Sequence, residues 1–488
     1  MDRAILKTSL IILASLGLAF LFNFLFFEKQ IGISVLIFNI ILLATVFLLE
    51  SRRRTQFKKT WWLVLAILFF TLMVGIRANE LLTFLNVCAA FGLLVLLANE
   101  LIGIPAPLMK LRDYLIFVFL APLRMLGRAL SIISLIGQIR STVKHRDIWV
   151  RAIKGAIMAV PILIIFAILF SQADLVFSSF VNNFFNINIS ERAAQYIVLL
   201  LFAFVASLSF LSYIFVQKQT QPALAREKSG VSAQSGREIE MMVFLGLISV
   251  LFLVFIVFQI TYLFGGEANI AKAGFTYAQY ARRGFWELLA VAMLSLATLF
   301  ASQKYAGIES KKEKRFLIPA LILIAEVAII IVSAFKRLSL YIDAYGMTEQ
   351  RFYAAGFIML LSVLFILLAI KFIKTKKENF FTFGALLSIM AFVAAVNIMN
   401  PDAFIAKYNI EQYDRTDKID VIYMGYYLST DAENWKIELY KKLQGEDKNA
   451  LRELLQKQKD YLQKNSGNWQ STNFSRGRAL KLLQEAEL

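Results

Sequence analysis

Long uncharged stretches recur along the chain and predict helices that cross a membrane. A hydrocarbon core of about 30 Å requires roughly 20 consecutive apolar residues in a helix. The runs that approach this length are 8–27, 31–49, 60–76, 81–98, 155–171, 194–216, 241–264, 286–301, 316–335, 354–370 and 380–396. The pattern therefore predicts an all-α fold, a polytopic transmembrane bundle of about 11 helices.

Beyond residue 400 the apolar runs stop and amphipathic helical patterns begin. We expect short helices at 402–413, 431–443, 449–464 and 475–487. Thr430 followed by Glu433 has the spacing of a capping box at the start of the second helix. A segment of this length buries only a modest core, so the sequence predicts a small helical C-terminal soluble domain.

The same patterns divide the chain into four segments. We expect an N-terminal four-helix membrane segment at 1–98, a cytoplasmic loop at 99–154, a seven-helix membrane core at 155–400 and an extracytoplasmic domain at 401–488. The stretch 113–136 is apolar enough for a twelfth crossing. Arg124 and Arg128 recur with other polar residues on one face, which favours an amphipathic helix on the inner leaflet. A helix packed on the cytoplasmic side of the bundle is the alternative.

The distribution of basic residues predicts the orientation. With the N-terminus inside, the cytoplasmic segments carry roughly three times as many lysines and arginines as the short external loops. If 113–136 also crossed the membrane, most of the later basic loops would lie outside. We therefore expect a multi-pass protein of the cell membrane with a cytoplasmic N-terminus and an extracytoplasmic C-terminus.

Composition supports this class and excludes several others. The chain is 59% hydrophobic with a mean hydropathy of +0.64, which is too apolar for a soluble protein. Basic and acidic residues are equal in number beyond residue 400, so the net charge of +18 belongs to the membrane part and does not indicate nucleic-acid binding. Single residues of cysteine (Cys88) and histidine (His145) argue against histidine–cysteine metal clusters and Ser-His-Asp triads, and we expect no metal or other cofactor.

Two predicted external loops, 274–287 and 335–351, keep basic residues against the orientation rule. Because a short cytoplasmic loop joins the helices between them, their outer ends should lie close together. Arginine forks beside tyrosine hydroxyls suit a phosphate or carboxylate, such as a lipid head group. The candidate ligand-binding residues are Arg282, Arg283, Glu287, Arg337, Tyr341 and Tyr345. The alternative is an interfacial aromatic belt whose arginines form ion pairs with Glu287, Asp343 and Glu349.

Glu326 lies ten residues into a predicted crossing, close to the bilayer centre. A carboxyl group at this depth is costly unless it is neutral, paired or hydrated, so it should face the bundle. A proton relay or coupling-cation site is one interpretation. A neutral acid hydrogen-bonded to a neighbouring helix is the other.

A family resemblance is carried by the segments 172–174, 280–289, 337–341, 344–348, 400–406, 409–410, 468–471 and 473–476. They resemble a bacterial membrane family of unknown function, DUF4173, and the resemblance extends from about residue 161 to the end. It implies a bacterial membrane protein and assigns no reaction, ligand or catalytic residue.

Three functions fit these observations. The first is a non-enzymatic envelope protein that binds an anionic or lipid-like ligand at its outer face, among membrane lipids, and transports or senses it. The second is a membrane transferase acting on a lipid-phosphate carrier, with Glu287, Asp343 or Asp174 as the base. A structural scaffold is the third.

Overall fold

The fold is described from a computed structural model. The residues that it describes are 2–49, 54–110, 113–114, 125, 191–215, 237–263, 285–306, 314–374, 376, 378–465 and 467–486.

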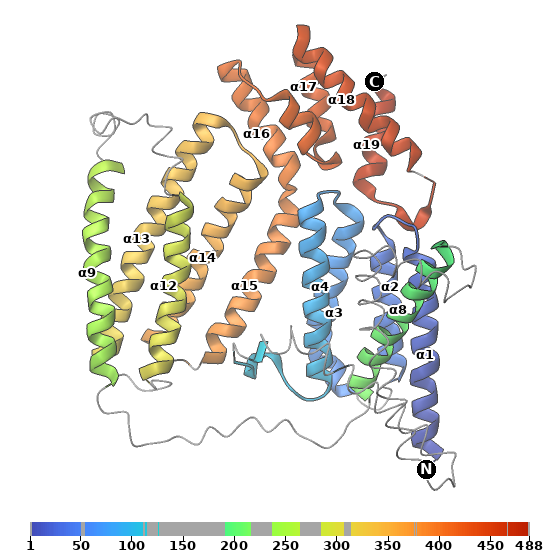
Figure 1. The fold of residues 1–488 in the computed structure, drawn as a ribbon, viewed down its shortest axis with the longest axis horizontal. Coiled ribbons are helices and arrows are strands. Elements are labelled where there is room, and N and C mark those ends of the chain that lie inside the picture. Colours follow the sequence, from blue (N-terminus) through green and yellow to red (C-terminus); the bar gives the residue numbers. More distant parts are fainter. Residues whose placement is uncertain are drawn as a thin grey trace, which may run out of the picture. The chain divides into compact units, whose positions relative to one another are not determined.

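Helices make up the described chain, and no strand occurs in it, which confirms the all-α prediction (Figure 1). The apolar helices are α1 (Asp2–Phe26), α2 (Ser34–Leu49), α3 (Arg54–Ile76), α4 (Glu80–Leu101), α8 (Glu191–Phe215), α9 (Arg237–Leu263), α12 (Phe285–Ala306), α13 (Lys314–Tyr345), α14 (Glu349–Ile373) and α15 (Glu378–Met399). Among described residues, 8 helices are long and apolar enough to cross a membrane; α2 and the apolar part of α3 are shorter. Every predicted apolar run matches one of these helices except 155–171, which lies outside the described residues. So does nearly all of 113–136.

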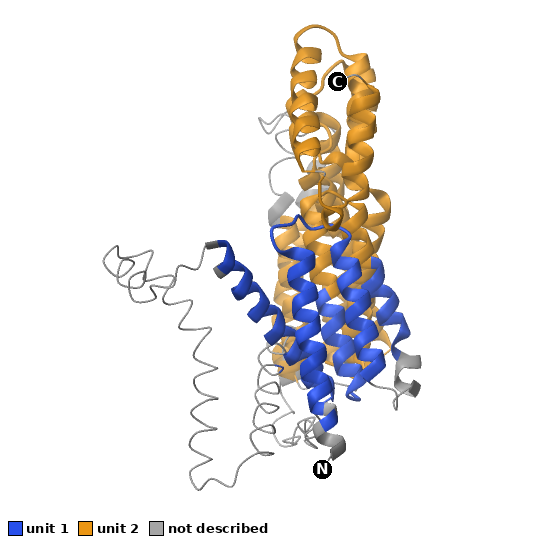
Figure 2. Cartoon of the chain, turned by 90° about the vertical axis from the view of Figure 1, so that its right-hand side faces the viewer, with its two compact units in different colours: residues 1–69, 91–104, 115–221 blue, residues 70–90, 105–114, 222–488 orange. Residues whose placement is uncertain are grey.

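The chain divides into two compact units (Figure 2). Unit 1 comprises residues 1–69, 91–104 and 115–221, and unit 2 comprises 70–90, 105–114 and 222–488. Helices α3 and α4 contribute residues to both units. The four segments expected from the sequence stay a prediction.

In unit 1, α8 packs along α1. The side-chain amide of Asn23 donates to the main-chain oxygen of Tyr196 at 3.1 Å. Arg192 pairs with Glu28 at 2.5 Å near the same end of the two helices. Polar contacts thus tie an N-terminal helix to one more than 160 positions later.

In unit 2, α13 packs against α9, α12 and α14, and α14 packs against α15. Buried side chains recur along α13 every three or four positions, as a helix in a bundle requires. Helices α14 and α15 approach closely at Gly356, where an added Cβ would lie 2.7 Å from the ring of Phe392. Small residues at such crossings allow helix backbones to come together in lipid.

Helix α13 extends far beyond its apolar run. The sequence predicted a loop at 335–351, but helix continues to Tyr345, so the connection to α14 is Gly346–Thr348. At 1.5 Å per residue, the added turns carry α13 about 15 Å past residue 335. The loop prediction failed because polar side chains there lie on the surface of a continuing helix.

The polar C-terminal region is helical, as expected. Its elements are α16 (Pro401–Thr416), η2 (Tyr423–Tyr427), η3 (Thr430–Ala432), α17 (Glu433–Lys442), α18 (Gly445–Lys464), η4 (Trp469–Ser471) and α19 (Phe474–Glu485). The predicted capping box is wrong. Ser429 instead accepts from the main-chain nitrogen of Asp431, and Glu433 is buried beside Lys436. Figure 1 shows α16 continuing beyond the end of α15.

Candidate functional site

The turn between α3 and α4 is held by residues from the C-terminal part of unit 2. One carboxylate oxygen of Asp431 accepts from the main-chain nitrogens of Ala78 and Asn79, at 2.9 and 3.3 Å. Arg77 donates through Nε to the main-chain oxygen of Asn397 at 2.8 Å, at the end of α15. The main-chain nitrogens of Ala78 and Asn79 lie at the start of α4, where main-chain donors lack helical partners. The carboxylate of Asp431 satisfies these two donors.

The side chain of Asn79 joins two acids at the ends of other helices. Its Nδ2 lies 3.0 and 3.1 Å from the two carboxylate oxygens of Asp402, in the first turn of α16. The same nitrogen donates to Glu349, the first residue of α14. Its Oδ1 accepts from the main-chain nitrogen of Leu82 at 2.9 Å, which caps α4.

Asp402 is completely buried. Besides Asn79, it accepts from the main-chain nitrogen of Ser429 at 3.0 Å, just before η3. We call Asn79, Glu349, Asp402 and Asp431 the polar junction. It connects the starts of α4, α14 and α16 with the chain that leads into α17.

Burial controls the electrostatics of this region outside the membrane helices. Burial raises the pKa of Asp431, although hydrogen bonds from Ser475 and Ala78 oppose the shift. Burial also lowers the pKa of Arg77, against the attraction of Asp431 and Asp402. Tyr423, whose hydroxyl accepts from the main-chain nitrogen of Glu349 at 2.8 Å, has a pKa raised to about 12, mainly by burial. The junction therefore concentrates acids in a site with little solvent, where each charge interacts strongly with the others.

On another side of the first turn of α14, Arg351 covers two tyrosines. Its guanidinium carbon lies 4.0 Å from the ring centroid of Tyr341 and 5.9 Å from that of Tyr345, and the two rings are 5.2 Å apart. Nη1 donates to the main-chain oxygens of Tyr345, at 3.0 Å, and of Gly346. We call Arg351, Tyr341 and Tyr345 the cation–aromatic platform.

The turn after α13 sets the position of this platform. Gly346 has a φ of +80°, a conformation that favours glycine, and an added Cβ would lie 3.0 Å from Oδ1 of Asn409. The Asn409 amide accepts from the main-chain nitrogen of Met347 at 2.7 Å and donates to its oxygen at 2.9 Å. Helix α16 thereby holds the turn between α13 and α14.

The structure brings together some of the residues proposed from the sequence. Tyr341 and Tyr345 meet as expected, with Arg351 added over them. Arg337, one turn before Tyr341 on α13, is buried. Arg282 and Arg283 lie outside the described residues, as do Asp174 and the side chain of Glu287.

The interfacial-belt alternative placed ion pairs at Asp343 and Glu349, and the described residues provide hydrogen-bonding partners for both acids. Asp343 accepts from the hydroxyl of Tyr408 at 3.1 Å, and Glu349 accepts from Asn79. No arginine of the described chain pairs with either acid. Both acids accept hydrogen bonds from neutral side chains. These bonds link the α13–α14 hairpin to α16 through Asp343 and to the start of α4 through Glu349.

Glu326 faces the interior of unit 2, as expected, with 7% of its surface exposed. Ser249 of α9, itself buried, lies beside it across the α9–α13 contact. In the part of the chain that the structure describes, no three His, Cys, Asp or Glu side chains are arranged so that they could hold a metal ion.

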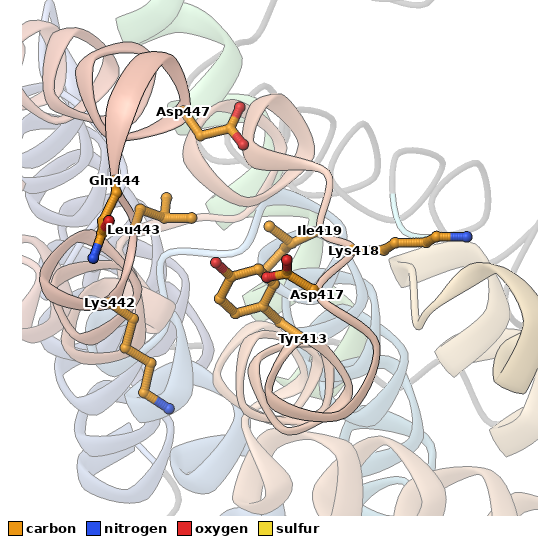
Figure 3. Close-up of a pocket in the computed structure, with 8 residues that line it drawn as sticks. All are labelled: Tyr413, Asp417, Lys418, Ile419, Lys442, Leu443, Gln444 and Asp447. Atoms are coloured by element: carbon orange, nitrogen blue, oxygen red, sulfur yellow. The ribbon is translucent and has the colours of Figure 1, made fainter.

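A separate pocket of about 580 Å³ lies at the far end of α16, between α16 and the turn from α17 to α18 (Figure 3). Its lining residues are Tyr413, Asp417, Lys418, Ile419, Lys442, Leu443, Gln444 and Asp447. Lys442 already pairs with Asp414 at 2.8 Å and with Glu438 at 3.5 Å. The pocket is open and carries both signs of charge, so its chemistry specifies no ligand class.

The family model for DUF4153, a domain of unknown function, matches residues 63–437. The chain belongs to this family. The DUF4173 resemblance therefore named the wrong family of unknown function, and the match begins about a hundred residues earlier than expected. No curated protein and no solved structure matches the chain. DUF4153 membership and the apolar helices identify a membrane protein without assigning an activity.

The DUF4153 match includes the whole polar junction and the whole platform. Asn79 and Arg351 were not among the candidate residues predicted from the sequence. A local signal existed for Asn79, because an asparagine directly before Glu80 and an apolar run is typical of a helix N-cap. Its contacts with Asp402 and Glu349 had no such signal, since they join positions about 300 residues apart.

Proposed function

We propose that this DUF4153 protein is a non-enzymatic protein of the bacterial cell membrane that binds an anionic, lipid-like ligand and transports or senses it. The binding group is the cation–aromatic platform, on the face that carries the C-terminal domain. The distribution of basic residues favours an extracytoplasmic position for this face. The observation that carries the proposal is the half-buried Arg351 guanidinium held over two tyrosines.

The bonding of Arg351 supports an anion as the ligand. Its Nη1 is occupied by two main-chain oxygens, while the described residues place no carboxylate within ion-pair distance of the guanidinium. A guanidinium carries five N–H donors in a fixed fork, so donors remain for a phosphate or carboxylate. Tyr345 is 54% exposed and adds a hydroxyl donor.

The location supports an amphiphilic ligand. Arg351 lies three residues before the apolar run that begins at 354, about 5 Å along the helix at 1.5 Å per residue. Head groups occupy the layer just beyond the hydrocarbon core. A phospholipid whose phosphate is bound by Arg351 would therefore have its acyl chains beside the apolar part of α14.

Arg351→Ala tests this function in the full chain extracted with its lipids. Native mass spectrometry should show loss of bound anionic phospholipid, with affinity weakened by about 1.5–3 kcal/mol because a charge-assisted hydrogen bond is removed. Arg351→Lys should restore little, since lysine lacks the fork. Tyr345→Phe removes a hydroxyl without disturbing the contacts of Arg351 and should give a smaller loss.

Arg415→Ala is the matched control, because Arg415 also donates to a main-chain oxygen, that of Glu411 at 3.1 Å, but has an exposed position on α16. A folded Arg351→Ala protein that keeps its full phospholipid load would eliminate the proposal. Arg351 would then serve as a cap for the final carbonyls of α13.

A further inference from the structure

A short segment of the C-terminal region exposes large apolar and aromatic side chains. Ile422, Tyr426 and Tyr427 are 63%, 71% and 63% exposed, in and next to the π-helical turn η2. Positions i, i+4 and i+5 fall on one side of a turn with i→i+5 hydrogen bonds. Tyr427 contacts Tyr423 and Tyr426 at ring-centroid distances of 5.8 and 5.2 Å, so the exposed surface is ordered by aromatic packing.

Close packing underneath holds this turn against α18. An added Cβ on Gly425 would lie 2.6 Å from Leu454 and 3.1 Å from Leu451. Gly425 and Met424 are buried, while Ile422, Tyr426 and Tyr427 face away from this contact. The turn therefore has a buried side and an exposed aromatic side.

Hydrogen bonds at both ends place the segment at the level where the membrane helices begin. The Tyr423 hydroxyl accepts from the main-chain nitrogen of Glu349, five residues before the apolar run of α14. After Leu428, the main-chain nitrogen of Ser429 donates to Asp402, six residues beyond the apolar run of α15. These offsets correspond to about 7 and 9 Å along a helix. A head-group layer is about 6 Å thick on each side of the hydrocarbon core, so the main chain of this segment lies just beyond the layer, and side chains directed toward the bilayer are long enough to enter it.

Tyrosine is suited to this layer because its ring is apolar and its hydroxyl remains hydrated. A polar protein surface would gain nothing from exposing two tyrosines and an isoleucine together. We propose that Ile422, Tyr426 and Tyr427 insert into the head-group layer of the bilayer and hold the C-terminal region against the membrane surface. The partner is the lipid surface itself, and the contact does not involve Arg351.

Nitroxide accessibility tests this contact in the full chain. Tyr426→Cys and Ile422→Cys, each in a Cys88→Ala background, are spin-labelled and reconstituted in vesicles of equal parts phosphatidylcholine and phosphatidylglycerol. Collisions with oxygen, which concentrates in lipid, are compared with collisions with a water-soluble nickel chelate. Asp447→Cys is the control, because Asp447 lines the pocket at the far end of α16, about 24 Å from the start of that helix.

We expect a several-fold higher ratio of oxygen to nickel collisions at positions 422 and 426 than at 447. Labels at 422 and 426 with the same ratio as the label at 447 would overturn the proposal. So would immobilised labels shielded from both reagents, which would indicate a protein covering the surface. Using two labelled positions keeps the test valid if one substitution prevents folding.

Discussion

Both carboxylate oxygens of Asp402 lie within hydrogen-bond distance of the side-chain nitrogen of Asn79, at 3.0 and 3.1 Å, although 323 positions separate the two residues. One amide thus links the start of α4 to the start of α16, and it reaches Glu349 of α14 as well. A buried acid without such a donor would be costly, so the contact stabilises the arrangement of three helix ends.

Asn79→Ala should lower the stability of the protein by about 1–3 kcal/mol, because Asp402 and Glu349 would lose a shared donor in a buried site. Thermal unfolding of the purified protein in detergent measures the effect. Asn465→Ala is the control, since Asn465 is an exposed amide that bonds a main-chain oxygen of its own helix, that of Tyr461. Equal melting of the Asn79→Ala protein and the wild type would show that the junction contributes no stability.

The raised pKa of Asp431 predicts a pH dependence with a definite sign. The folded state holds the Asp431 proton more tightly than the unfolded state, so protonation favours folding. The wild type should therefore lose stability relative to Asp431→Asn as pH rises above about 4, the ordinary pKa of aspartate. Unfolding curves of both proteins across pH provide the measurement. Glu453→Gln provides the opposite case, because Lys457 lowers the pKa of Glu453. The wild type should gain stability relative to Glu453→Gln as pH rises. A stability difference between wild type and Asp431→Asn that grows in favour of the wild type with pH would contradict the prediction.

The buried pair Glu433–Lys436 should behave as one unit. Both side chains are almost completely buried, with 3.7 Å between Nζ and Oε2, and burial raises the pKa of Glu433 and lowers that of Lys436. Lys436→Met should cost about 3–5 kcal/mol, because it leaves a buried acid without its partner. Adding Glu433→Gln should recover a large part of this loss. A double mutant whose loss equals the sum of the two single losses would show that the pair is not coupled.

Glu326→Gln should be tolerated, since an amide retains a hydrogen-bonding group beside Ser249 on α9. Glu326→Lys should destabilise the protein by about 2.5–3.5 kcal/mol, the cost of placing a lysine at the centre of a membrane helix. Detergent-unfolding curves and the yield of membrane-inserted protein measure both variants. If Glu326→Gln is as damaging as Glu326→Lys, a carboxyl group is required there for more than packing.

The orientation is tested by cysteines placed at Ser466 and Ser310 in a Cys88→Ala background. The charge distribution predicts that an impermeant thiol reagent labels intact cells at position 466 alone. Permeabilised cells, in which both positions should react, provide the control. Labelling at 310 alone in intact cells would reverse the orientation.

The sequence by itself determined the helices, because lipid imposes a strong local requirement. Runs such as 354–370 must be helical when no water is available to their main-chain groups, so length and polarity suffice to find them. The α-helical C-terminal region also followed from local periodicity. Only the tertiary structure decided that 335–345 continues α13, that Glu433 turns inward toward Lys436, and that Asn79 meets Asp402. Those outcomes depend on which surfaces pack together, and packing between distant segments leaves no periodic signal in the chain.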